Sequence, residues 1–123
     1  MEQVTIMKKH WHTENPTSCP MLLTINIIGG KWKPIILHML SEGTMRFGEL
    51  KKNIAPVSQK MLTQQLRELE ADGIISRKLY PEVPPRAEYS LTERGMTLKP
   101  VLQGLYDWGQ MNSADASRAT ENT

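Results

Sequence analysis

The segment 59–72 carries a polar face at helical spacing, and its side chains are of the types that contact nucleic acid. This face consists of Lys60, Thr63, Gln64, Arg67 and the small Ala71. Threonine and glutamine hydrogen-bond to base edges, whereas lysine and arginine reach phosphates. We therefore expect the face to bind double-stranded DNA. The alternative is an ordinary solvated helix surface, on which the same residue types are common.

The opposite face of the same segment is apolar, which fixes the orientation of the polar one. It carries Leu62, Leu66 and Leu69. We expect these leucines in the core, because residues three and four apart share one side of a helix. Ser58 is placed to cap the first turn, and Gly73 is placed to end the helix. The positive end of the helix dipole, at Ser58 and Gln59, favours a phosphate, so both residues join the predicted DNA contacts.

The elements on either side of this helix match a winged helix-turn-helix. A shorter helix over 46–54 and a break at 55–57 precede it, which is the proportion of a helix-turn-helix. After Gly73 the apolar pattern alternates, which predicts a hairpin with strands at 74–79 and 87–91 and a proline-rich loop between them. Lys78 enters this loop and Arg86 leaves it, so we expect both to contact phosphates or the minor groove.

Three further helices are predicted. One begins at Cys19-Pro20, presents Met21, Leu22, Ile25 and Ile28 as its apolar face, and ends at Gly29-Gly30. A second spans 31–40, with Pro34 in its first turn. The last begins after Thr92 and runs over 93–111, with a kink expected at Pro100.

The predicted fold class is α+β and mainly helical: a winged helix-turn-helix with additional terminal helices that dimerise. We divide the chain into a loose arm (1–18), one domain (19–111) and a polar tail (112–123). The 39% hydrophobic and 23% charged residues are ordinary for a globular domain, and the net charge of +2 does not by itself indicate a nucleic-acid partner. No apolar run approaches the roughly 20 residues of a membrane span, so we expect a cytoplasmic protein and no membrane partner.

Several motifs occur in order between residues 19 and 108. They are CP (19–20), IIGGKW (27–32), RFGEL (46–50), SQKMLT (58–63), LRELEADG (66–73) and YPEVPPRAEYSLT (80–92). Together they resemble the HxlR family of regulators, which is related to MarR-type proteins. The resemblance implies a homodimer that joins through its terminal helices, binds an inverted-repeat operator and acts as a repressor, with no enzyme activity.

The predicted dimer contact also has a basis in the residues themselves. Val101, Leu105 and Trp108 form an apolar stripe on the last helix that is too large for a lone helix to expose. Two copies would hold two recognition helices about 34 Å apart, which is one turn of DNA.

The single cysteine, Cys19, is a predicted redox sensor. A helix N-terminus stabilises a thiolate and so makes the sulfur more reactive. Some members of the resembled family also sense electrophiles or oxidants through a cysteine at this place. With no second cysteine, oxidation would give a link between two subunits, a mixed disulfide or an alkylated thiol. The alternative is that Cys19 caps the helix and packs as a small apolar residue.

Other chemistries find little support. His10, His12 and Cys19 fit no zinc spacing, and Trp32 stands where a phosphate-binding loop needs serine or threonine, so we predict no metal and no cofactor. Trp11, Trp32 and Trp108 leave open a small-molecule effector. A winged helix that binds proteins without DNA, and an enzyme with Cys19 as nucleophile, are the remaining alternatives.

Overall fold

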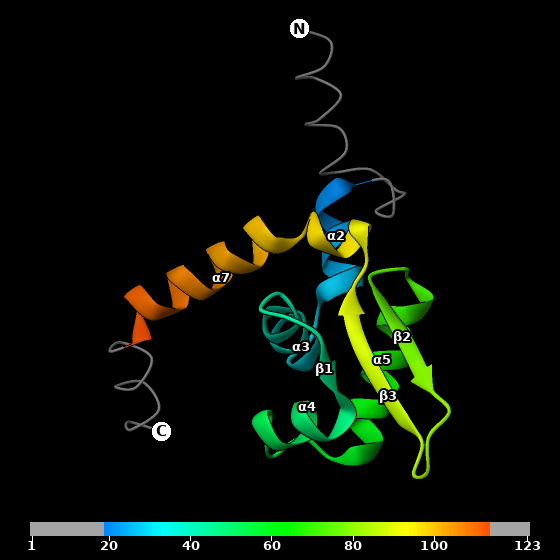
Figure 1. Ribbon diagram of the computed structural model, residues 1–123. Helices are drawn as coiled ribbons and strands as arrows, with labels where there is room; N and C mark the ends of the chain where they lie inside the picture. Colours follow the sequence, from blue (N-terminus) through cyan, green and yellow to red (C-terminus); the bar gives the residue numbers. More distant parts are fainter. Residues whose placement is uncertain (1–18, 114–123) are drawn as a thin grey trace, which may run out of the picture.

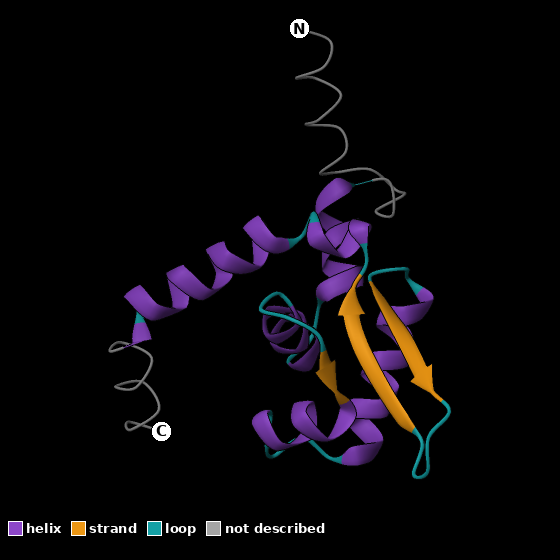
Figure 2. Ribbon diagram, viewed as in Figure 1, coloured by secondary structure: helices purple, strands orange, loops and turns teal. Residues whose placement is uncertain are grey.

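The computed structural model describes residues 19–113, called the described residues below, as helices with a small sheet (Figures 1 and 2). In chain order the elements are α2 (Pro20–Ile28), α3 (Trp32–Leu40), β1 (Met45–Arg46), α4 (Phe47–Asn53), α5 (Gln59–Ala71), β2 (Ile75–Tyr80), β3 (Arg86–Leu91), α6 (Glu93–Met96) and α7 (Lys99–Met111). The predicted class, α+β and mainly helical, is confirmed.

The core forms around α5. Leu62, Leu66 and Leu69 are at most 1% exposed, as predicted, and they belong to one apolar cluster with the buried residues of α3 and α4. From α3 the cluster takes Ile36, Leu37 and Leu40. Because one side of α5 is fully buried in this cluster, the polar side chains on its other side must face outward.

The predicted hairpin is confirmed, and a strand that the sequence did not reveal joins it. β2 and β3 pair antiparallel from Ile75 opposite Leu91 to Tyr80 opposite Arg86. β1 pairs with the other edge of β3, which gives the sheet order β1-β3-β2. A strand of two residues has no readable alternation, and β1 extends the sheet only because the fold brings it beside Glu88 and Tyr89.

The N-terminal part of α5 and the tip of the hairpin lie at the same end of the molecule (Figure 1). Gly73, with a φ of +74°, makes the reversal between them, so β2 runs back beside α5. α2 lies at the opposite end, and α7 projects away from the rest of the domain. The molecule therefore presents one end for the helix-turn-helix and hairpin and another for its terminal helices.

The predicted apolar face of α2 is largely exposed. Ile28 is buried, but Met21 is 55% and Ile25 is 51% exposed. α2 ends at Ile28, directly before Gly29-Gly30, as predicted. The described residues simply place little against this face.

The single kinked helix predicted over 93–111 is also wrong. The structure has two helices there, and the prolyl nitrogen of Pro100 explains the break. It has no hydrogen to donate to Met96, and α6 ends at Met96 for that reason. Pro100 instead lies in the first turn of α7, where a missing N–H has no consequence. Thr92 caps α6 as predicted, because its hydroxyl accepts from the Gly95 N–H at 3.0 Å.

The predicted arm (1–18) and residues 114–123 of the predicted tail lie outside the described residues. The division of the chain at 18 and 111 therefore remains a prediction. Within residues 19–113 no helix has both the length and the apolar character needed to cross a bilayer.

The close approach of α6 to the start of the sheet gives a test of the fold. A methyl group on residue 95 would lie 2.1 Å from the backbone oxygen of Ile74, so we expect Gly95→Ala to lower the unfolding free energy by about 1–3 kcal/mol or more. In Gly48→Ala the added methyl meets nothing within 4 Å, and a gain of up to about 1 kcal/mol is expected. Urea denaturation at one protein concentration measures both. Equal effects would contradict the packing described.

Candidate nucleic-acid interface

Most of the residues predicted to bind DNA surround one shallow hollow on α5. Its volume is about 490 Å³, and it is lined by Gln59, Lys60, Thr63, Gln64, Arg67 and Glu68. All but Glu68 were predicted as contacts. Ser58 stands at the head of the helix, where its hydroxyl accepts from the backbone N–H of Met61 at 3.0 Å. The predicted cap is thus confirmed, and the hydroxyl's main role is to fix the start of α5.

The hollow contains two cations, Lys60 and Arg67, that have no counter-charge among the described residues. Among residues 19–113 neither Lys60 nor Arg67 forms an ion pair, and both are exposed. An unpaired exposed cation is available to a phosphate at little desolvation cost. The hollow therefore combines two free positive charges with the uncharged donors and acceptors of Thr63 and Gln64.

A buried lysine of α3, Lys33, binds Glu68, one of the residues that line the hollow. Lys33 is 8% exposed, and its Nζ donates to Glu68 Oε1 at 2.5 Å. Glu68 Oε2 in turn accepts from Gln64 Nε2 at 3.2 Å. The Lys33 hydrogen bond, then the Gln64 hydrogen bond and the charge of Lys33, hold the pKa of Glu68 below its usual 4.5. Glu68 is thereby ionised but neutralised, so its charge does not oppose a phosphate nearby.

Lys33 and Glu68 are not among the residues that the sequence predicted for this surface. A signal was present, because Lys33 lies three and four residues before Ile36 and Leu37, both of which are fully buried. A lysine on the buried face of a helix needs a carboxylate partner. Which carboxylate serves is a matter of tertiary structure, since α3 and α5 are far apart in the chain.

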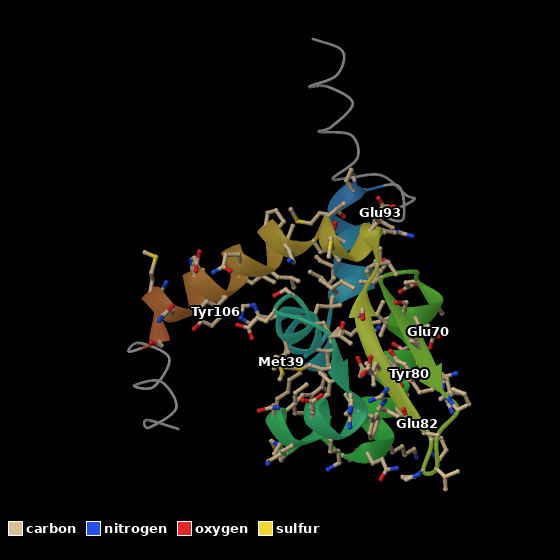
Figure 3. The ribbon with its side chains drawn as sticks, viewed as in Figure 1. Met39, Glu70, Tyr80, Glu82, Glu93 and Tyr106 are labelled. Carbon is tan, nitrogen blue, oxygen red and sulfur yellow. The ribbon has the colours of Figure 1, made fainter. Side chains whose placement is uncertain are left out.

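The two predicted hairpin cations differ in their surroundings. Lys78 is exposed, with its Nζ 5.0 Å from the ring centre of Tyr80. The Arg86 guanidinium makes three contacts within the hairpin. Its Cζ lies 4.0 Å from the centre of the Tyr80 ring, its Nη2 3.1 Å from Glu82 Oε2 and its Nε 3.9 Å from Glu88 Oε2. Tyr80 and Glu82 lie together at the hairpin in Figure 3. Lys78 forms no ion pair among the described residues and is available to a partner, whereas Arg86 mainly stiffens the loop.

A second small hollow joins α5 to the sheet. About 160 Å³ in volume, it is lined by Thr63, Arg67, Glu70, Arg77 and Tyr89. Arg77 lies 4.0 Å from Glu70, and burial raises the pKa of Tyr89 above its usual 10. Sequence reasoning missed Arg77. The available signal was its position directly before Lys78 in β2, because successive residues of a strand point to opposite faces.

The terminal helix α7 bears an exposed apolar surface. The predicted interface residues Val101, Leu105 and Trp108 are 42%, 52% and 69% exposed. A groove of about 370 Å³ between α3 and α7 is lined by Pro34, Ile35, His38, Met39, Leu102, Leu105 and Tyr106. His38 stacks on Tyr106 with 4.8 Å between ring centres, and Figure 3 shows Tyr106 on the side of α7 that faces α3.

Cys19 precedes the first turn of α2, as predicted. Its backbone is extended, its carbonyl accepts from the Leu23 N–H at 3.1 Å, and its side chain forms no capping hydrogen bond. The residue is 5% exposed. Packing as a small apolar residue is thus part of its role, and attack on the sulfur requires that it become exposed. His10 and His12, considered above with Cys19 for a zinc site, and Trp11, considered for an effector site, lie outside the described residues. Within residues 19–113 no cluster of three metal-binding side chains occurs.

Comparison with known proteins identifies the fold. The family model for HxlR-like helix-turn-helix proteins matches residues 27–117. The chain belongs to this family. An uncharacterised HTH-type transcriptional regulator of Bacillus subtilis (strain 168), YdeP, is 49% identical over 109 residues, which cover 85% of each chain. The predicted winged helix-turn-helix and the resemblance to the HxlR family are confirmed.

Solved structures agree with the family model. The redox regulator HypR in its oxidised form is 49% identical, with a TM-score of 0.74, and the match covers 76% of this chain and 97% of HypR. The reduced form of the transcriptional regulator YodB from B. subtilis is 39% identical, with a TM-score of 0.65, covering 74% and 90%. This HxlR-family chain therefore has transcriptional regulators as its relatives in both sequence and structure.

The buried lysine predicts how the fold responds to acid. Since Lys33 lowers the folded-state pKa of Glu68, the pair stabilises the fold above pH 4.5, and this contribution is lost as the pH falls through the lowered pKa. We expect the unfolding free energy of the wild type, minus that of Lys33→Met, to be larger at neutral pH than well below pH 4.5. Urea denaturation across this range measures the difference. Lys99→Met, at an exposed lysine without an ion pair in residues 19–113, should show no such shift; the same pH dependence in both variants would refute the assignment.

Proposed function

We propose that this protein is a transcriptional regulator that binds an inverted-repeat operator as a homodimer through α5 and the hairpin. The observation that carries the proposal is the polar hollow on α5, together with the burial of the opposite face of this helix in the core. A helix fixed in this way presents its polar residues rigidly, as recognition in the major groove requires. The family membership supports the same function.

The proposed contacts follow from the chemistry of each side chain. Lys60, Arg67 and Lys78 lack ion pairs among the described residues, and they supply the phosphate contacts. Thr63 and Gln64 reach base edges, while Ser58 and Gln59 lie at the positive end of the helix dipole. Arg86 must share its guanidinium with Glu82, so we expect a smaller contribution from it than from Lys78.

The proposed homodimer forms through α2 and α7. Met21 and Ile25 of α2 and Leu105 and Trp108 of α7 are each at least half exposed. A second copy with the same faces would bury both sets, and a two-fold axis would present two recognition helices to successive major grooves. On the family resemblance alone, we assign this dimer the action of a repressor.

Binding to DNA is tested through its salt dependence. We expect Lys60→Ala to weaken the binding of a fluorescent duplex from the protein's own promoter region and to lower the slope of log K against log salt by about 1, because one phosphate contact is lost. Lys99→Ala removes the same charge from the start of α7 and should leave both quantities unchanged. Fluorescence anisotropy at several salt concentrations measures them. Absence of duplex binding by the wild type at every salt concentration would favour the protein-interaction module instead.

We further propose that oxidation or alkylation of Cys19 switches DNA binding. HypR is known in oxidised and reduced forms, and YodB in reduced and diamide-treated forms, so thiol chemistry accompanies this fold in its relatives. Cys19 lies at the start of a helix that we place in the dimer interface. A bond formed at its sulfur would therefore change how the two subunits pack.

Diamide provides the test of this switch. It takes two electrons and two protons from two thiols, so the expected product is a Cys19-to-Cys19 disulfide between subunits. We expect diamide to alter duplex affinity about tenfold or more in the wild type and to give a dimer on a non-reducing gel, with dithiothreitol reversing both. Cys19→Ser, which has no thiol, should respond to neither reagent. Unchanged binding by the oxidised wild type would contradict the switch and leave a small-molecule effector as the signal.

A further inference from the structure

The amide of Gln64 is tethered through a chain of hydrogen bonds that reaches into the protein. Gln64 Nε2 donates to Glu68 Oε2 at 3.2 Å, and Glu68 Oε1 accepts from Lys33 Nζ at 2.5 Å. Lys33 comes from α3, which packs on the inner side of α5. The exposed side chain of Gln64 is therefore held by a residue of the core, whereas Lys60 and Thr63 beside it form no side-chain hydrogen bond within the described residues.

The tether decides which end of the amide faces outward. The Lys33 side chain is 10% exposed and needs an anionic partner, and Glu68 is that partner. An ionised carboxylate only accepts hydrogen bonds, so it binds the nitrogen end of the Gln64 amide and repels the oxygen end. One N–H of Gln64 is thereby used. The amide oxygen and the second N–H remain for a ligand in the hollow of α5.

This pair of groups has one good complement in the major groove. Adenine offers the N6 amino group as a donor and N7 as an acceptor, and these fit a glutamine amide in a bidentate manner. Guanine presents two acceptors and thymine an acceptor beside a methyl group, so both would face the fixed oxygen unfavourably. Cytosine offers its amino group alone.

We propose that Lys33 and Glu68 hold the Gln64 amide in the orientation that recognises adenine. Gln64 is then a specificity-determining residue of α5, and Lys33 and Glu68 are positioning residues that never touch the base. The inference rests on the proposed DNA-binding function and adds the base that the regulator selects at one position of each half-site.

The test is selection of binding sites from a randomised duplex pool, followed by sequencing of the bound fraction. The position read by Gln64 is the one whose preference disappears in Gln64→Ala. We expect the wild type to prefer adenine there by about tenfold over guanine or thymine. In the double variant Lys33→Met/Glu68→Gln, the neutral amide at 68 both donates and accepts, so Gln64 can turn over. We expect the adenine preference to fall severalfold, while affinity for unrelated duplex stays the same.

Two controls accompany the selection. Glu70→Gln removes a carboxylate from the same helix without touching Gln64, and it should keep the wild-type preference. Lys33 and Glu68 are changed together so that no buried cation is left unpaired. Gln64→Glu, at an exposed position, gives an independent readout: its carboxylate accepts only and should move the preference from adenine to cytosine.

The outcomes are distinct. Loss of the adenine preference in the double variant, with Glu70→Gln unaffected, supports the inference. Preference for another base at the Gln64 position, or a full adenine preference in the double variant, overturns it while leaving DNA binding intact. A wild type that binds no duplex at all overturns the proposed function, and this inference with it.

Discussion

Burial of one side of α5 is the constraint on which the rest of the structure depends. Leu62, Leu66 and Leu69 are removed from water by α3, α4 and the sheet, and each buried leucine contributes on the order of 2 kcal/mol to the fold. The helix can neither rotate nor slide without exposing them. The polar face of α5 is consequently a rigid surface. Its side chains have fixed relative positions and can therefore recognise a ligand of regular geometry.

Charge is distributed on this surface in two different ways. Lys60 and Arg67 form no ion pair within residues 19–113, and a polyanion can neutralise them. Glu68 and Arg86, in contrast, are matched by Lys33 and Glu82, and these pairs order their surroundings. The modest net charge of the chain is therefore compatible with a polyanionic partner, because the sign and pairing of a few local charges matter more than the total.

The terminal helices α2 and α7 expose apolar side chains that the described residues leave uncovered. α2, at the end of the molecule opposite the hairpin tip, and α7, which projects from the side of the domain, both expose large apolar side chains, while the side chains at the centre of the domain are buried. An apolar surface of this kind favours association with a matching surface. Cys19 begins α2, so the thiol and the exposed apolar side chains of this helix belong to the same part of the fold.

The sequence by itself determined the local features of this protein. The leucine spacing and the Ser58 cap defined α5, the alternation after Gly73 defined the hairpin, and the motifs defined the family, because each depends on residues close in the chain. What only the tertiary structure decided depends on residues far apart: the pairing of β1 with β3, the exposure of Met21 and Ile25, and the partners of Lys33 and Arg86. Periodicity tells which side of a helix is apolar, but what lies against that side is set by packing between distant elements. For the same reason the sequence indicated Gln64 as a contact residue, and only the structure showed the bonds that orient its amide.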